Sequence, residues 1–252
     1  MDNWIFEYNR IEDKDFKPFF NMLLNLFREY FGDDIMSKEN CTLQNFVDDN
    51  YPRLSCDGNK LFIKTTVGLI DSPLQSGCQY DYRMYVFQMA HELMHYAIMQ
   101  QFAEGSCVDW FEETLCEAMA FIGLEYTMNK YFSRRPIVTR ETRENLKSYL
   151  EKAMTEDQHS VLESCSTLET LSEINRHYAQ GDNRSAQTKE RIFIYSLLSE
   201  HSQQARILLN YRQYVEPNKL LIDFDKWIRD CPDGIAFLNE VRTIQPIISG
   251  AS

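Results

Sequence analysis

The segment from Met84 to Leu124 constrains the fold of this chain more than any other. Its first half contains the pentapeptide His91-Glu92-Leu93-Met94-His95, surrounded by apolar residues at helical spacing, and neither Gly nor Pro occurs between Asp81 and Ala103. Residues four apart on a helix lie one above the other on the same face. The segment therefore predicts an amphipathic helix that presents the imidazoles of His91 and His95 side by side.

Two imidazoles one turn apart can both bind a single zinc ion, at about 2.0–2.1 Å. Glu92 follows the first histidine, where it can stand beside the metal and take a proton from a water molecule. A third ligand is still required. The metzincin pattern would place a Gly and a third His at positions occupied by Ile98 and Gln101, so that pattern is absent. A carboxylate from a second helix is the alternative.

A second helical run extends from residue 108 to residue 132, after a break at Gly105-Ser106. Glu113 and Glu117 are four apart on it and project together. We expect Glu113 to be the third ligand. We expect Glu117 to accept a hydrogen bond from the non-ligating nitrogen of a metal histidine, His91, which would fix its tautomer. Three other ligands stay open from the sequence alone: Glu117 itself, Glu112 and the thiol of Cys107.

This combination of motifs resembles the gluzincin group of zinc metallopeptidases, the thermolysin-like clan with an HExxH helix and a downstream glutamate. The resemblance covers roughly residues 40–132, and its second motif begins within Trp110-Phe111-Glu112-Glu113. It implies a small sheet packed on the HExxH helix, and peptide hydrolysis with Glu92 as general base. The residues that carry it are His91, Glu92, His95, Glu113 and Glu117.

Gluzincin-like chemistry also implies a donor that stabilises the oxyanion of the tetrahedral intermediate, supplied by a His or Tyr of the helical half. We expect His177 and Tyr178 to provide it. The other tyrosines that could do so are Tyr195, Tyr211 and Tyr214.

The pattern along the whole chain predicts an α+β fold that is mostly helical. Strands are expected at residues 3–11, 42–47 and 60–67, and a helix at 16–31. Strand 60–67 is nearest before the HExxH helix, so the resemblance makes it the candidate substrate-binding edge. Ser133-Arg134-Arg135-Pro136 is the expected boundary between a zincin-like catalytic region (1–135) and a helical region that closes the cleft (136–252). Helices of that region are expected at about 139–154, 167–179, 187–203, 204–215, 222–230 and 234–244.

Composition limits the partners. The formal charge of −12 over 252 residues argues against a nucleic-acid surface and against an anionic membrane. No run approaches 18 apolar residues, and the N-terminal residues do not form a signal peptide. Seven cysteines without C-x-x-C spacing are typical of reduced thiols. These features predict a cytoplasmic protein; they do not indicate its oligomeric state.

The sequence thus predicts a zinc-dependent peptidase that acts on a peptide or protein substrate. No G-x-M-E-N-like segment is present, which favours an endopeptidase or oligopeptidase over an aminopeptidase. A second hypothesis is a catalytically silent, metallopeptidase-like interaction or regulatory module, and the intact Glu92 argues against it because a structural zinc site needs no general base. A third is hydrolysis of a non-peptide amide. Manganese, iron or another divalent ion could also occupy the site.

Overall fold

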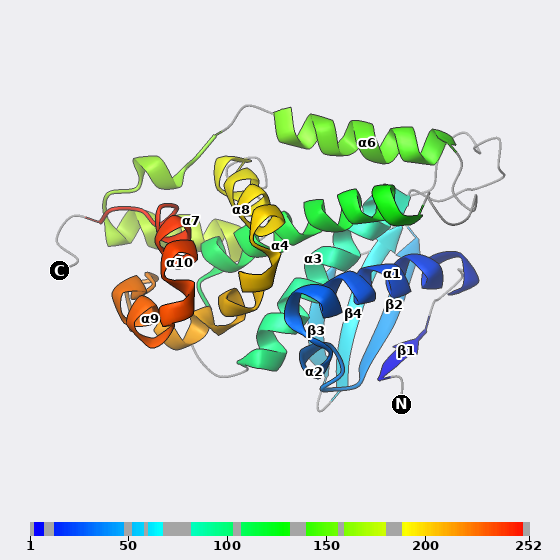
Figure 1. Ribbon diagram of the computed structural model, residues 1–252, viewed down its shortest axis with the longest axis horizontal. Coiled ribbons are helices and arrows are strands. Elements are labelled where there is room, and N and C mark those ends of the chain that lie inside the picture. The colour runs from blue at the N-terminus through cyan, green and yellow to red at the C-terminus, as the bar shows by residue number, and fades with distance from the viewer. Residues whose placement is uncertain are drawn as a thin grey trace. The chain divides into compact units, whose positions relative to one another are not determined.

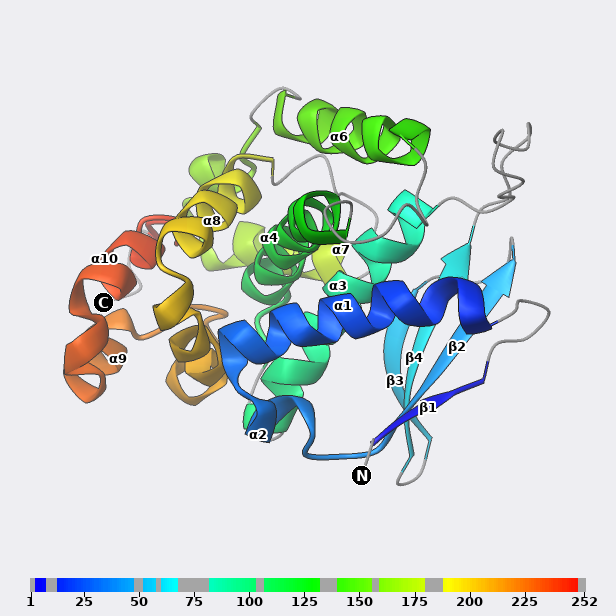
Figure 2. The same cartoon turned by 45° about the vertical axis from the view of Figure 1, so that its right-hand side comes forward.

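The structure is a computed structural model of the 252-residue chain (Figures 1 and 2). It describes residues 3–7, 13–47, 52–57, 60–67, 82–102, 107–131, 140–155, 159–179 and 188–248. The expected boundary at Ser133–Pro136 lies outside these ranges. The fold is α+β and mostly helical, with one small mixed sheet, as the sequence predicts.

Four strands form the sheet, in the order β1-β2-β4-β3. Strands β1 (Trp4–Phe6), β2 (Cys41–Val47) and β4 (Lys60–Val67) run parallel, and β3 (Arg53–Asp57) is antiparallel to β4. The predictions for β2 and β4 are confirmed, and β3 was not predicted. Of the strand expected at 3–11, Trp4–Phe6 is observed, and residues 8–11 lie outside the described residues. Strand β3 pairs with β4 over Lys60–Lys64 and forms the edge of the sheet beside it. The expectation that strand 60–67 is a sheet edge is therefore wrong over these residues.

One face of the sheet is buried by helices. Leu43 and Ile63, a register pair in β2 and β4, are fully buried on it. Trp4 contacts Phe20 of α1 (Asp13–Phe31) and Tyr96 of α3 (Tyr82–Gln101), with ring centroids 5.2 and 4.8 Å apart. Helices α1 and α3 therefore meet over the same face of the sheet, and Figure 2 shows α1 running across it.

Helix α3 is the predicted HExxH helix, and it differs from the prediction in one respect. Almost all of its residues between Tyr85 and Ile98 are buried, so it has no solvated stripe. A helix enclosed on all sides belongs to a core, and its polar residues need partners there. The sheet and α1 supply part of this cover, because Tyr85 packs against Phe16 with centroids 4.8 Å apart.

Helix α4 (Asp109–Tyr126) is the predicted second helix and continues as a π-helical turn, Thr127–Tyr131. Gly123 allows a close approach between α4 and its neighbours. A Cβ on Gly123 would lie 2.8 Å from the Cβ of Ala90 in α3 and 3.1 Å from Cδ2 of Leu23 in α1. The absence of a side chain at this position therefore sets the spacing of α3 and α4 next to His91.

The helices predicted after residue 138 are close to those observed. They are α6 (Arg140–Thr155), α7 (Leu168–Ala179), α8 (Thr188–Glu200), a 3-10 helix at Ser202–Tyr214, α9 (Phe224–Asp230) and α10 (Ile235–Arg242). Helix α2 (Asp33–Met36) and the short 3-10 turns at Leu162–Ser164 and Pro232–Gly234 were not predicted. Two compact units can be distinguished, residues 1–100 with 119–153, and residues 101–118 with 154–252; the continuous helix α4 contributes to both. None of the described helices is both long and apolar enough to cross a membrane.

Candidate metal site

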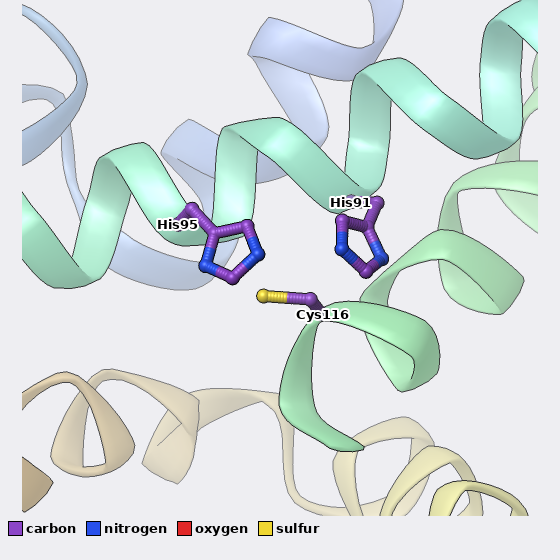
Figure 3. Close-up of side chains that lie close together, drawn as sticks. All are labelled: His91, His95 and Cys116. Atoms are coloured by element: carbon purple, nitrogen blue, oxygen red, sulfur yellow. The ribbon is translucent and has the colours of Figure 1, made fainter. Parts of the chain in front are cut away.

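The two histidines of α3 form a group with a cysteine of α4. One ligand atom each from His91, His95 and Cys116 all lie within 4.8 Å of one another. The imidazole rings of His91 and His95 are 5.0 Å apart, centroid to centroid, and both are directed toward the Cys116 side chain in Figure 3. His91 and Cys116 are buried and His95 is half-buried. This group could hold a metal ion.

The chemistry of the three donors fits a transition metal. Imidazole nitrogen and thiolate sulfur are both ordinary zinc ligands, whereas magnesium and calcium are bound by oxygen. A set of three protein ligands is also what catalytic zinc sites use, because a fourth position is kept for water or substrate. The soft thiolate makes zinc, copper(I) or iron better suited to the group than a hard cation.

Cys116 is the ligand candidate that sequence reasoning missed. The E-x-x-x-E pattern favoured carboxylates, and a lone cysteine in an apolar helix is usually a packing residue. A signal was nevertheless present: Cys116 follows Glu113 by three residues, so the two side chains share one face of α4. Glu113 is half-buried on α4 and does not belong to the His91–His95–Cys116 group. Its role as a ligand remains a prediction.

Glu117 contacts an arginine. Its Oε2 accepts a hydrogen bond from Nη1 of Arg191, in α8, at 3.3 Å, and both side chains are only 6% exposed. A carboxylate has two oxygens, so this ion pair leaves room for the predicted hydrogen bond to His91, which remains a prediction. Removing one partner of a buried ion pair leaves the charge of the other uncompensated, so the loss of either Arg191 or Glu117 should destabilise the protein.

Glu112 and Cys107 are engaged elsewhere. Glu112 accepts hydrogen bonds from Arg212 Nη2 at 3.0 and 2.9 Å, one to each oxygen, and another from the Tyr211 hydroxyl. Burial, followed by the charges of Glu112 and Asp109, raises the pKa of Cys107 to about 12. A thiol with that pKa stays protonated at neutral pH, and the thiolate is the metal-binding form. Neither residue belongs to the metal-capable group.

The predicted oxyanion donors lie on α7. His177 is exposed and Tyr178 is 6% exposed, so these adjacent residues point to different sides of the helix. Their catalytic roles remain predictions. Of the other tyrosines, Tyr211 donates to Glu112, and burial and that carboxylate raise its pKa well above the ordinary value. Tyr214 stacks on Trp227, with centroids 5.2 Å apart.

Glu92, the predicted general base, is 3% exposed. It follows His91 directly in α3, and its role as general base remains a prediction. An isolated carboxylate is costly to bury, so its presence in the core calls for a functional or structural partner.

No protein-family model, no curated protein and no solved structure matches the chain. The case for a function therefore depends on the residues of the site.

Proposed function

We propose that this protein is a zinc-dependent peptidase in which His91, His95 and Cys116 bind the metal and Glu92 acts as general base. The observation that carries the proposal is the convergence of two imidazoles and a thiol in the core, with a buried carboxyl group one residue from the first imidazole. A purely structural zinc site is closed by four protein ligands and has no use for such a carboxylate.

A zinc ion in this position would lower the pKa of a coordinated water to about 7 and polarise the carbonyl of the scissile bond. Glu92 accepts the proton that the attacking water loses, and it later donates that proton to the leaving amine. The three protein ligands carry one negative charge, on Cys116, so the site keeps a net positive charge that favours the developing oxyanion. Glu113, on the same face of α4 as Cys116, is the ligand that would replace or supplement the thiolate.

The substrate we propose is a peptide or protein, and the reaction is endo- or oligopeptidase cleavage. None of the described cysteines forms a disulfide: Cys41, Cys56, Cys107, Cys116, Cys165 and Cys231. A thiolate ligand and several cysteines outside disulfides are stable in a reducing compartment, which supports a cytoplasmic location. The competing function is a zinc-stabilised interaction module without activity, and a substrate carrying a non-peptide amide is the other outcome.

The decisive experiment compares the wild-type protein with the Glu92→Gln variant on a mixed peptide library. Glu92→Gln keeps the shape of the side chain but removes the base, so we expect peptide cleavage to be lost while one equivalent of zinc remains bound. Glu173→Gln, an identical change at an exposed position of α7, is the matched control and should cleave normally.

Three results would count against the proposal. Undiminished cleavage by Glu92→Gln would remove this residue from the mechanism. Cleavage that persists in the presence of a strong chelator would remove the metal. A wild-type protein that binds zinc but cleaves no peptide would favour the interaction module.

A further inference from the structure

A buried glutamine fastens the HExxH helix to the sheet. The side chain of Gln88, in α3, accepts a hydrogen bond at 2.8 Å from the backbone N–H of Thr66, in β4. The Gln88 amide also donates to the Thr66 hydroxyl at 2.9 Å. Gln88 is 5% exposed and Thr66 is 8% exposed. Both ends of the glutamine amide are therefore used, in a region from which water is largely excluded.

The position of Thr66 in the sheet explains why its N–H is available to a side chain. Within the described residues, β3 pairs with β4 from Lys60 to Lys64 only, whereas β2 accompanies β4 as far as Val67. Thr66 thus lies beyond the end of β3. A buried backbone N–H needs an acceptor, and Gln88 supplies the one that a longer β3 would have provided.

Gln88 also has a specific place on α3. His91 and Glu92 follow it by three and four residues, so all three side chains lie along one face of the helix, with Gln88 one turn nearer the N-terminus. The hydrogen bonds between Gln88 and Thr66 are therefore made at one end of the helix face that carries His91 and Glu92.

We propose that Gln88 is a positioning residue: its bonds to Thr66 set the rotation and the axial position of α3 so that Glu92 stands correctly relative to the metal ligands and the substrate. The inference rests on the proposed function. The bonds are made in the turn that precedes the ligands, so their loss shifts the turn of Glu92 most. A misplacement of about 1 Å can reduce a catalysed rate by about 100-fold.

The test compares Gln88→Met, which keeps the length of the side chain but forms no hydrogen bond to Thr66, with a control on the same helix. Tyr96→Phe is that control, because the Tyr96 hydroxyl donates to the Glu39 carbonyl at 2.9 Å and also fastens α3 to another segment, but beyond His95. Peptide cleavage, zinc content and hydrogen exchange of the backbone amides are measured for both.

We expect Gln88→Met to lower kcat by about tenfold or more with KM little changed, because a misplaced base slows the chemical step. It should keep one equivalent of zinc and speed exchange at the Thr66 amide. Tyr96→Phe should keep kcat within about twofold of the wild type, since it leaves the turn of Glu92 in place. Thr66→Ser retains both bonds and should behave as the wild type, whereas Thr66→Val should fall between the wild type and Gln88→Met.

The inference is overturned if Gln88→Met and Tyr96→Phe reduce kcat equally, or if Gln88→Met retains wild-type kcat although the Thr66 amide exchanges faster. Failure of the proposed function has a different signature, because the zinc-loaded wild-type protein would then cleave no peptide at all.

Discussion

Gly123→Ala tests how closely the metal site depends on the packing of α3 against α4. Gly123 lies within α4, and alanine is more favourable than glycine in the interior of a helix by about 1 kcal/mol. The new Cβ, however, would lie 2.8 Å from the Cβ of Ala90, and carbon atoms ordinarily approach to about 3.5 Å. The two helices would have to separate by roughly 0.7 Å, the difference between these distances. Ala90 Cβ is attached directly to the backbone and cannot turn away.

The effect on metal binding follows from the position of the two residues. Ala90 is adjacent to His91, and Cys116 lies seven residues before Gly123, on the same face of α4. Metal–ligand distances tolerate deviations of about 0.2 Å, so a separation of roughly 0.7 Å weakens the site. We expect zinc affinity to fall by about tenfold or more. Overpacking costs about 1–3 kcal/mol, so after the helix gain the protein should be destabilised by about 1 kcal/mol.

Competition with a chromogenic chelator measures the zinc affinity, and urea unfolding of the zinc-free protein measures the stability. Gly234→Ala is the control, because its Cβ would meet Cδ1 of Ile207 at 2.7 Å and Sγ of Cys231 at 3.2 Å, both ends of side chains that can rotate. It should leave zinc affinity unchanged. A more stable Gly123→Ala protein with wild-type zinc affinity would refute this reasoning.

Two further predictions concern buried charges. Arg191→Met should destabilise the protein by about 3–5 kcal/mol, because it leaves the charge of Glu117 uncompensated. Adding Glu117→Gln to this variant should restore most of the lost stability. A loss of less than about 1 kcal/mol for Arg191→Met in urea unfolding would contradict this prediction. Burial raises the pKa of Glu190 above its ordinary value despite a hydrogen bond from Ser160. The folded state therefore binds the Glu190 proton more tightly than the unfolded state does. The stability that protonated Glu190 contributes is fully present below the ordinary pKa of a glutamate, and it is lost as the pH rises through the raised pKa. Glu190→Gln should accordingly stabilise the protein at pH 7 and lose that advantage in acid, and a variant less stable at pH 7 than the wild type would show that the carboxylate is needed.

The sequence predicted the long helices and the two central strands because each has a local signal. Strand β4 has β-formers between two turn signals, α3 has a long apolar period without Gly or Pro, and α4 has one without Pro. Strand β3 has no such signal. It is five residues long and largely exposed, so its conformation is determined by pairing with β4, which is a tertiary effect.

The candidate site was predictable in part for the same reason. His91 and His95 are related by helix geometry alone, which a sequence fixes locally. The third donor depends on how α4 is rotated about its own axis when it meets α3. That rotation is decided by packing, such as the contact of Gly123 with Ala90, and by ion pairs such as that of Glu117 with Arg191. No local pattern could therefore distinguish Cys116 from Glu113.

The most direct test of the metal site is the absorption spectrum of the cobalt(II)-substituted protein. If His91, His95 and Cys116 bind the ion, the wild-type protein will show a near-ultraviolet thiolate-to-cobalt charge-transfer band and intense visible bands of a four-coordinate site. The charge-transfer band will disappear in Cys116→Ser and remain in Glu113→Gln. A wild-type spectrum without that band, together with loss of cobalt from Glu113→Gln but not from Cys116→Ser, would contradict the assignment of Cys116 as the third ligand.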